Sequence, residues 1–199
     1  MRKGAGIAGP FLCSPAWQVS AKLQFWPCAQ KLDRTSMAPI SGALPMARLD
    51  LNDIPEHQGS TYPKPFDREV GHRIRQRLGD AGGLTQFGVN LMQLPPTSAW
   101  SAQRHWHSAE DEFVYVVAGE VVLVTDKGEE VMRVGDCAAF PANTPNGHHL
   151  INKSGSMAVY LEVGSRIASD RVVYPDIDLV FDSNADGYAH KDGTPYPST

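Results

Sequence analysis

HWHSAEDEFVYVVAG, residues 105–119, is the stretch that decides the fold of this chain. Side chains alternate across a β-strand, so His105 and His107 lie on one face if the segment is extended. A short turn can bring Glu112, on the next strand, back to that face. Imidazole and carboxylate are ligands that divalent iron, manganese, nickel, copper and zinc accept. The stretch therefore predicts a transition-metal site inside a β-structure.

The spacing His105-x-His107-x4-Glu112-x6-Gly119 resembles the first motif of the cupin family, G-x5-H-x-H-x3-4-E-x6-G. Every defined position from the first histidine to the final glycine matches, while Ala99 replaces the leading glycine. A lone H-x-H pair is usually a surface pair, so the metal site is indicated by the whole spacing rather than by the pair. The resemblance implies an all-β fold, the double-stranded β-helix or jelly-roll barrel, and a homodimer.

Residues 135–152, GDCAAFPANTPNGHHLIN, resemble the second cupin motif, G-x5-P-x-G-x2-H-x3-N, less closely. Asn143 replaces the middle glycine, and Asn146 occupies the histidine position. His148, two residues later, restores the spacing to the final asparagine, so we interpret the turn as carrying a two-residue insertion. The metal ligands that the resemblance then implies are His105, His107, Glu112 and His148. His149 is the alternative fourth ligand, because a register shift of one residue exchanges the two histidines. A site with three protein ligands is the other alternative.

Length and composition agree with one domain of this kind. The chain has 199 residues and 42% hydrophobic residues, which is ordinary for a single globular domain. Its 18 glycines and 15 prolines suit short strands joined by tight turns. The three cysteines have no C-x-x-C spacing, so a reduced, cytoplasmic setting is the simpler expectation. No apolar run reaches the length that a membrane span requires, which is about 20 residues.

Residues 1–45 differ from the rest of the chain. They carry a net charge of +4, whereas the remainder carries −8. They show neither the period of a strand nor that of a helix. We expect a disordered extension or a start codon assigned too early, followed by a single cupin domain over residues 46–199. The acidic body argues against a nucleic-acid surface, so the expected partner is a small-molecule ligand or substrate.

Alternating and turn-forming residues predict short strands through the middle of the chain. The predicted strands are residues 85–94, 103–107, 112–117, 120–125, 129–134, 137–140, 147–152 and 157–163. Residues 51–69 are proline-rich and are expected to run outside the barrel as extended chain. Residues 70–78 carry basic side chains and are compatible with an edge strand or a short helix. Residues 174–199 are less regular, and residues 188–197 within them are expected to fold back over the barrel or onto a partner subunit.

Strand alternation also predicts what surrounds the metal. The residues expected to share the ligand face and form a substrate pocket are Gln103, Val114, Val116 and Leu150. The residues expected on the opposite face are Trp106, Phe113 and Tyr115. Arg104 and His149 are candidates for a substrate anchor and a general base, although alternation favours side chains that point away from the metal. Tyr160 and Glu162, on a later strand, could reach the pocket from its far side.

The ligand set indicates one divalent transition metal: iron, manganese, nickel or zinc. Three imidazoles and one carboxylate leave a net charge of about +1 and two open positions in an octahedral field. The function that follows is a metal-dependent enzyme acting on a small oxygenated molecule, with dioxygenase, isomerase or lyase chemistry open. The alternatives are a non-catalytic cupin that binds or senses a small ligand, and a barrel with a vestigial site. No cluster of Lys and Arg lies near the motifs in the sequence, which argues against a sugar-phosphate substrate.

Overall fold

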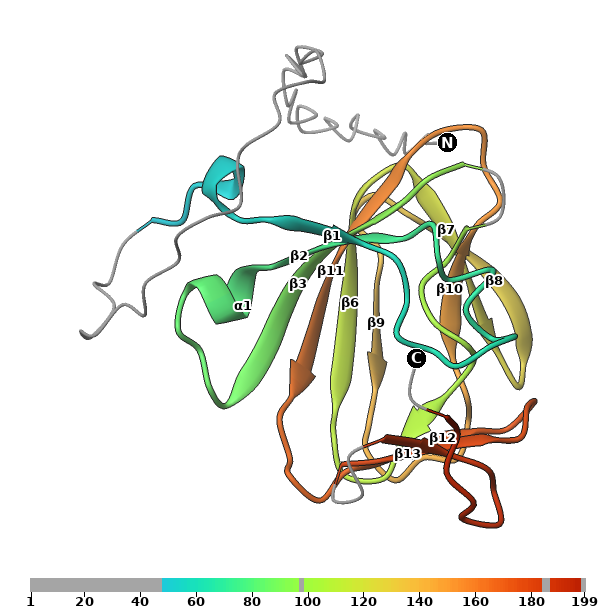
Figure 1. The fold of residues 1–199 in the computed structure, drawn as a ribbon. Helices are drawn as coiled ribbons and strands as arrows, with labels where there is room; N and C mark the ends of the chain where they lie inside the picture. The colour runs from blue at the N-terminus through green and yellow to red at the C-terminus, as the bar shows by residue number, and fades with distance from the viewer. Residues whose placement is uncertain (1–47, 97–98, 184–186, 198–199) are drawn as a thin grey trace, which may run out of the picture. The chain divides into compact units, whose positions relative to one another are not determined.

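The computed structural model describes residues 48–96, 99–183 and 187–197, so the segment 1–45 lies outside the described residues. Regular structure in these ranges is almost entirely β (Figure 1). A single 3-10 turn, Leu51–Asp53, and one short helix, α1 (Leu78–Ala81), accompany the strands. Neither of these described helices is long and apolar enough to span a bilayer.

The strands form three antiparallel sheets. The first has the order β1-β2-β3-β11-β6-β9, the second β4-β10-β7-β8 and the third β14-β13-β12-β5. The first sheet consists of β1 (Glu56–Gln58), β2 (Ile74–Arg77), β3 (Phe87–Leu94), β11 (Ala158–Ser165), β6 (Glu112–Ala118) and β9 (Cys137–Phe140). The second consists of β4 (Ala99–Trp100), β10 (His149–Asn152), β7 (Glu120–Thr125) and β8 (Gly128–Arg133). The third consists of β14 (Gly187–Ala189), β13 (Leu179–Asp182), β12 (Arg171–Tyr174) and β5 (Trp106–His107).

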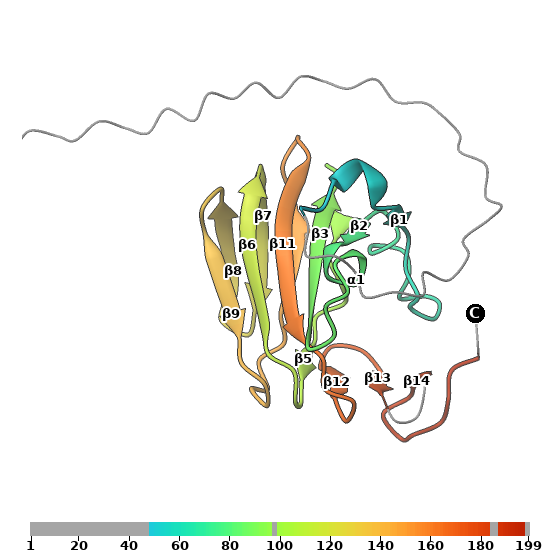
Figure 2. The same ribbon diagram turned by 90° about the vertical axis from the view of Figure 1, so that its left-hand side faces the viewer.

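This arrangement confirms the jelly-roll fold, with one correction. The described strands are not hydrogen-bonded into one closed barrel, because the first and second sheets remain separate ladders. Figure 2 shows the strands of the first sheet side by side, with β5, β12, β13 and β14 below its lower end. The candidate metal ligands enter from that end of the sheets, because β5 belongs to the third sheet and leads into β6 of the first.

Three segments differ from the sequence-based expectations. Residues 70–78 contain both a strand and the start of a helix, and β2 is internal because Glu56 of β1 pairs with Gln76 on its outer side. In the expected strand 103–107, just Trp106–His107 is strand, preceded by an isolated bridge at His105. The C-terminal region is regular, because β13 and β14 extend the sheet that β12 forms with β5.

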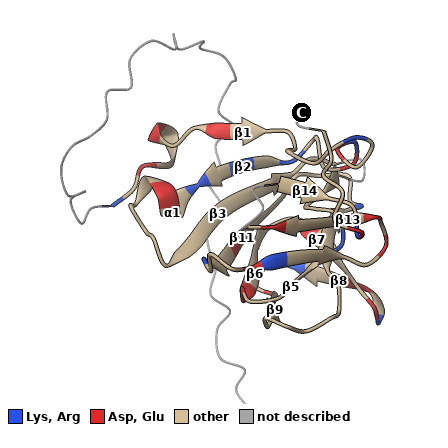
Figure 3. Ribbon diagram, turned by 60° about the horizontal axis from the view of Figure 1, so that its bottom comes forward, with Lys and Arg blue, Asp and Glu red and all other residues tan. Residues whose placement is uncertain are grey.

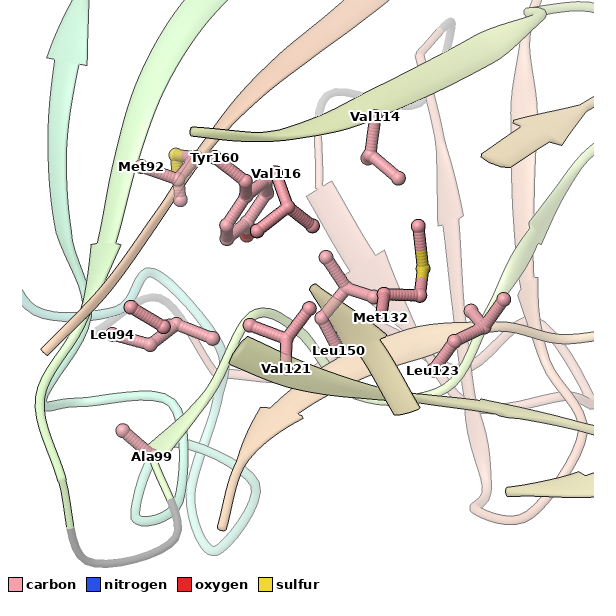
Figure 4. Packing of buried hydrophobic residues seen from close by; sticks show 11 residues of the cluster. Met92, Leu94, Ala99, Val114, Val116, Val121, Leu123, Met132, Leu150 and Tyr160 are labelled. Atoms are coloured by element: carbon pink, nitrogen blue, oxygen red, sulfur yellow. The ribbon is translucent and has the colours of Figure 1, made fainter. Parts of the chain in front are cut away.

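The main core lies between the inner faces of the first two sheets (Figure 4). Its most buried members come from β3, β6 and β11: Met92, Leu94, Val116 and Tyr160, each at most 1% exposed. Val121 and Leu123 of β7 meet them from the second sheet. Each such side chain contributes roughly 1.5–3 kcal/mol through removal from water. The core thus fixes the strands that carry the functional residues.

A second, aromatic cluster ties the C-terminal sheet to the chain before β2. Its buried members are Tyr62, Val70, Val172, Tyr174 and Leu179. The rings of Tyr62 and Tyr174 meet edge to face, with centroids 5.6 Å apart. The segment 51–69, which was expected to run outside the barrel, thus contributes Tyr62 to the core, and Tyr62 also lines a cavity.

Candidate metal centre

Three strands meet where the candidate ligands lie. His107 belongs to β5, Glu112 begins β6, and His148 immediately precedes β10. His105 and His148 form an antiparallel bridge, with backbone N–H···O distances of 3.1 Å and 2.8 Å. This bridge places two histidines from distant parts of the chain next to each other, which is why the two sequence motifs form one site.

Three imidazole nitrogens converge on one carboxylate oxygen. The Nε2 atoms of His105, His107 and His148 lie 3.6, 3.4 and 3.0 Å from Oε2 of Glu112. All four side chains are at most 17% exposed. Three imidazoles and a carboxylate around one point form a donor set that suits divalent iron, manganese, nickel or zinc. The residues present therefore fit a transition metal.

The contacts behind the histidines orient their rings. Nδ1 of His105 donates to the carbonyl oxygen of Gln103 at 2.8 Å, and Nδ1 of His107 is 2.7 Å from Oδ2 of Asp170. A hydrogen bond at Nδ1 leaves Nε2 free to ligate, which is the usual arrangement behind metal-binding histidines. The His148 ring is instead stacked on Phe140, with centroids 3.5 Å apart and planes 2° from parallel.

Asp170 is a site residue that sequence reasoning missed. Its side chain is 3% exposed. Its Oδ1 accepts hydrogen bonds from the backbone N–H groups of Ala109 and Glu110 at 2.8 Å and 3.3 Å, and from the hydroxyl of Ser108 at 3.3 Å. Both carboxylate oxygens are thus engaged, one with the turn between β5 and β6 and one with His107. We interpret Asp170 as a residue that orients His107, not as part of a second metal site.

The charges of the cluster are mutually dependent. Burial opposes ionisation of Glu112, but hydrogen bonds from His105 and His148 outweigh it and hold the Glu112 pKa well below its usual value. Burial likewise opposes protonation of His105, yet its interaction with Glu112 raises the His105 pKa. For His148, burial prevails and lowers the pKa. A carboxylate that stays ionised while buried is the charged ligand that a cation needs.

The departures from the second motif have structural explanations. Asn143 has a φ of 54°, a left-handed conformation that glycine adopts freely and that asparagine tolerates better than most residues. The side chain of Asn146 is engaged with the hairpin that follows β7, because its Oδ1 accepts a hydrogen bond from the backbone N–H of Asp126 at 2.9 Å. Gly119, the last position of the first motif, has a φ of 71°, and a Cβ there would lie 2.5 Å from the Met157 carbonyl oxygen.

A cavity of 130 Å³ adjoins the cluster and reaches His105, Glu112 and His148. Val114 and Leu150, both predicted pocket residues, line this cavity, as do Tyr160 and Glu162. Sequence reasoning missed Tyr62 and Arg73, from the chain before β3, and also Ser101, Ala102 and Phe140. For Arg73 the sequence did contain a signal: arginines recur at every second position in residues 73–77, which is typical of one face of a strand.

Three predicted roles differ from what the structure shows. Gln103 does not line this cavity, because its side-chain amide donates to the Phe66 carbonyl oxygen at 2.9 Å. Val116 is fully buried in the core instead. The guanidinium of Arg104 is held by Asp126 and Asp176, so this residue does not reach the cavity as a substrate anchor.

His149 faces the cavity but is separate from the ligand cluster. It is 4% exposed, its Nδ1 donates to the Ala102 carbonyl oxygen at 3.0 Å, and its ring meets Trp100 edge to face. Burial lowers the pKa of His149 to about 4. A base with so low a pKa is a weak proton acceptor at neutral pH, which argues against the general-base role. Of the two adjacent histidines, the geometry favours His148 as the ligand.

This buried histidine predicts an acid-sensitive stability. The pKa of His149 is about 4 in the folded chain and 6.5 in the reference state, so the unfolded chain binds the proton first. The free energy of unfolding should therefore fall as the pH is lowered from about 6.5 to 4, by roughly 3 kcal/mol from this residue. Denaturant unfolding across that range should show a shallower decline in His149→Asn than in the wild type. Equal slopes in the two proteins would contradict the assignment.

The comparisons with known proteins agree with this geometry. A family model described as a cupin domain matches residues 90–164. A sugar phosphate isomerase from a cupin superfamily, from Silicibacter pomeroyi, is 45% identical, with a TM-score of 0.72 over 76% of this chain and 98% of that chain. A protein provisionally named a sugar phosphate isomerase, from Acidithiobacillus ferrooxidans, is 28% identical, with a TM-score of 0.59 over 67% and 83%.

A predicted oxalate decarboxylase from Thermotoga maritima is 19% identical and matches with a TM-score of 0.50 over 61% of this chain and 100% of that chain, a likeness of fold alone. A search among curated proteins finds no match. The identity and coverage of the Silicibacter protein, together with the family model and the convergent histidines, show that the chain belongs to the cupin superfamily.

Proposed function

We propose that this cupin is a metal-dependent enzyme that acts on a small oxygenated molecule, and that its reaction is an isomerisation. The observation that carries the proposal is the convergence of His105, His107 and His148 on Glu112 beside a cavity. A divalent ion held there would act as a Lewis acid toward a substrate carbonyl or hydroxyl oxygen. The likeness to a protein named a sugar phosphate isomerase supports isomerisation over oxygenation.

A carboxyl group in the wall of the cavity, that of Glu162, also supports isomerisation. Isomerisation of a carbonyl compound needs a group that removes a proton from one carbon and returns it to another. Glu162 lines the cavity, and Asn90 donates a hydrogen bond to its carboxyl group at 2.9 Å. Burial, followed by the charge of Glu112, raises the pKa of Glu162 above its usual value. Glu162 is thus the candidate for proton transfer, and Tyr160 lies beside it on the same strand.

Elemental analysis of the purified, untreated protein is the first test. Near-stoichiometric zinc, manganese or nickel would support isomerase or lyase chemistry, and isomerisation of aldose and ketose substrates would be assayed next. Near-stoichiometric iron with substrate-dependent oxygen consumption would contradict isomerisation and favour a dioxygenase. No metal, even after reconstitution, would refute the enzyme proposal and favour a cupin that binds its ligand without catalysis.

We also propose that the chain forms a homodimer through the outer face of the first sheet. Phe113, Tyr115 and Val117 alternate along β6 on the face opposite the ligands, as predicted for the first two, and are 40%, 41% and 43% exposed. Three large apolar side chains in a row on one strand form the kind of surface that monomeric proteins usually cover. A two-fold axis would pair this face with itself.

The dimer is tested by molar mass in solution. Light scattering after size exclusion should give twice the chain mass of 21.7 kDa for the wild type. Tyr115→Lys should shift the protein toward the monomer, because it buries a charge at the interface. Val131→Lys, at a position 42% exposed on β8 of the second sheet, is the matched control and should remain dimeric. A monomeric wild type, or a dimeric Tyr115→Lys variant, would contradict the proposal.

A further inference from the structure

Three arginines lie in a row on the face of the first sheet that carries Glu112. Arg75 and Arg77 belong to β2, and Arg73 precedes the strand by one residue. Figure 3 shows the basic residues of β2 in blue. Spacing by two residues places all three side chains on one face. We refer to Arg73, Arg75 and Arg77 as the arginine strip.

Strand register identifies that face as the inner one. Arg75 pairs with Met92 of β3, which pairs with the core residue Tyr160. Arg77 pairs with Asn90, and Asn90 pairs with Glu162 of β11. Directly paired residues share a face of a sheet, so the arginine strip continues the row of side chains that leads to Glu162 and the metal cavity.

The arginine strip has few direct hydrogen-bonding or ion-pair partners in the part of the chain that the structure describes. Arg73 donates to the carbonyl oxygens of Gly59 and Ser101, and Arg77 lies 3.7 Å from Asp80. Arg75 forms no hydrogen bond or ion pair with any part of the chain that the structure describes. Burial, and then the charges of Arg77 and Arg73, lower the pKa of Arg75 and outweigh the opposing charges of Glu162 and Asp80. A half-buried guanidinium held between two others is an electrostatic cost unless an anion binds there.

A pocket of 200 Å³ lies directly against the strip. Its described lining consists of the three arginines and residues 57–61, and includes no carboxylate. The segment 57–61 adds the imidazole of His57 and the hydroxyls of Ser60 and Thr61. A cavity lined by guanidinium, hydroxyl and imidazole groups without acids has the composition of an oxyanion site.

We propose that the arginine strip binds an oxyanion of the substrate, a phosphate group, in this pocket. Guanidinium groups match the oxygens of phosphate with paired hydrogen bonds, and three of them favour a dianion over a carboxylate. The strip also answers the objection drawn from the sequence, where no basic cluster lies near the metal motifs. The cluster exists, but β2 and β3 bring it to the site from 28 or more residues upstream.

The pocket shares arginines with the cavity and the groove that border the candidate metal centre. Arg73 lines both the oxyanion pocket and the metal cavity, while Arg75 and Arg77 also border a 250 Å³ groove that reaches Glu112 and Glu162. A substrate held by its phosphate at the strip could therefore place its other oxygens toward the ligand cluster. This link to the metal rests on the proposed function, whereas the oxyanion site itself does not.

The test measures binding of inorganic phosphate to the full-length, EDTA-treated protein by calorimetry, in a buffer without other oxyanions. We expect saturable binding, weakened about tenfold or more by Arg75→Gln because a charge-assisted contact is lost. Arg75→Lys should fall between the two, since lysine keeps the charge without the paired donors. Arg133→Gln, at a side chain 68% exposed on β8, should bind as the wild type does. Thermal unfolding midpoints verify that each variant is folded.

Absence of saturable binding, or equal binding by the wild type and Arg75→Gln, would overturn the inference. Tighter binding of acetate than of phosphate would overturn the phosphate assignment. Repeating the titration after metal loading separates the two proposals. Phosphate binding that needs the metal and survives Arg75→Gln would refute the oxyanion pocket and leave the metal centre intact. Metal-free binding that Arg75→Gln abolishes, in a protein that never takes up metal, would support the pocket and refute the metal enzyme.

Discussion

His107→Ala is expected to lose stoichiometric metal, with a metal affinity weakened by more than about 100-fold. Loss of a residue that only hydrogen-bonds a metal ligand typically costs about 10–100-fold, and loss of the ligand itself should cost more. His107 supplies one of three convergent Nε2 atoms, 3.4 Å from Oε2 of Glu112. Glu112→Gln should lose metal as well, because it removes the single carboxylate of the donor set and its charge. The measurement is metal content after dialysis against a weak chelator, supported by a competition titration.

The adjacent histidines provide the control for this prediction. His149→Asn should retain the metal, because the His149 side chain contacts Ala102 and Trp100 and not Glu112, and asparagine can donate a similar hydrogen bond to the Ala102 carbonyl oxygen. His148→Ala should lose it. Loss of metal from His149→Asn together with retention in His148→Ala would mean that the ligand assignment is wrong by one residue.

Asp170→Asn is expected to weaken metal binding by about 10–100-fold while the protein stays folded. The amide can keep an oxygen toward the turn at Ala109 and Glu110, but its charge is gone and it no longer fixes the proton of His107 on Nδ1. Asp170→Ala should in addition lower the free energy of unfolding by about 3 kcal/mol or more, because buried donors lose their acceptor. A competition titration and denaturant unfolding give the two quantities.

Comparing the two Asp170 variants separates the effect of Asp170 on the orientation of the His107 ring from its effect on the stability of the folded chain. Metal affinity should fall in both variants, whereas a large loss of stability should be confined to Asp170→Ala. The wild-type stability should also decline in acid, because hydrogen bonds from His107 and Ala109 outweigh burial and lower the pKa of Asp170, so protonation favours the unfolded chain. Unchanged metal affinity in Asp170→Asn would show that the aspartate braces the turn without acting on His107.

Local patterns were sufficient for most of the central fold. The strand of residues 120–125 has the predicted bounds, and those at 129–134 and 157–163 are displaced by one or two residues. These segments are rich in β-branched and other apolar residues, and the first two are followed closely by Gly128 and Gly135, so pattern and structure coincide. The extent of the strand in residues 103–107 was predicted less accurately, because its pairing partners, His148 and β12, are distant in sequence.

The structure brings the four proposed ligands together, but it places some of the residues predicted to surround them elsewhere. The cavity positions of Val114 and Leu150 could be predicted from strand alternation, since both residues lie within the motifs on regular strands, β6 and β10. Gln103 was predicted to line the pocket and does not, because its segment is not a regular strand and its side-chain amide donates a hydrogen bond to the Phe66 carbonyl oxygen. Arg104 likewise pairs with Asp126 and Asp176, and neither contact could be deduced from the neighbourhood of the motif.

By itself, the sequence determined the family and the jelly-roll fold, and it grouped the proposed ligands His105, His107 and Glu112, because these depend on spacing within one strand and the following turn. His148 joins them through its long-range bridge with His105. Only the tertiary structure decided which other residues contact the proposed ligands or lie beside them. Asp170 reaches His107 through the pairing of β12 with β5, and the arginine strip reaches the inner face through the pairing of β2 with β3. Long-range strand pairing depends on the packing of the whole core, and no local pattern around residues 105–152 contains it.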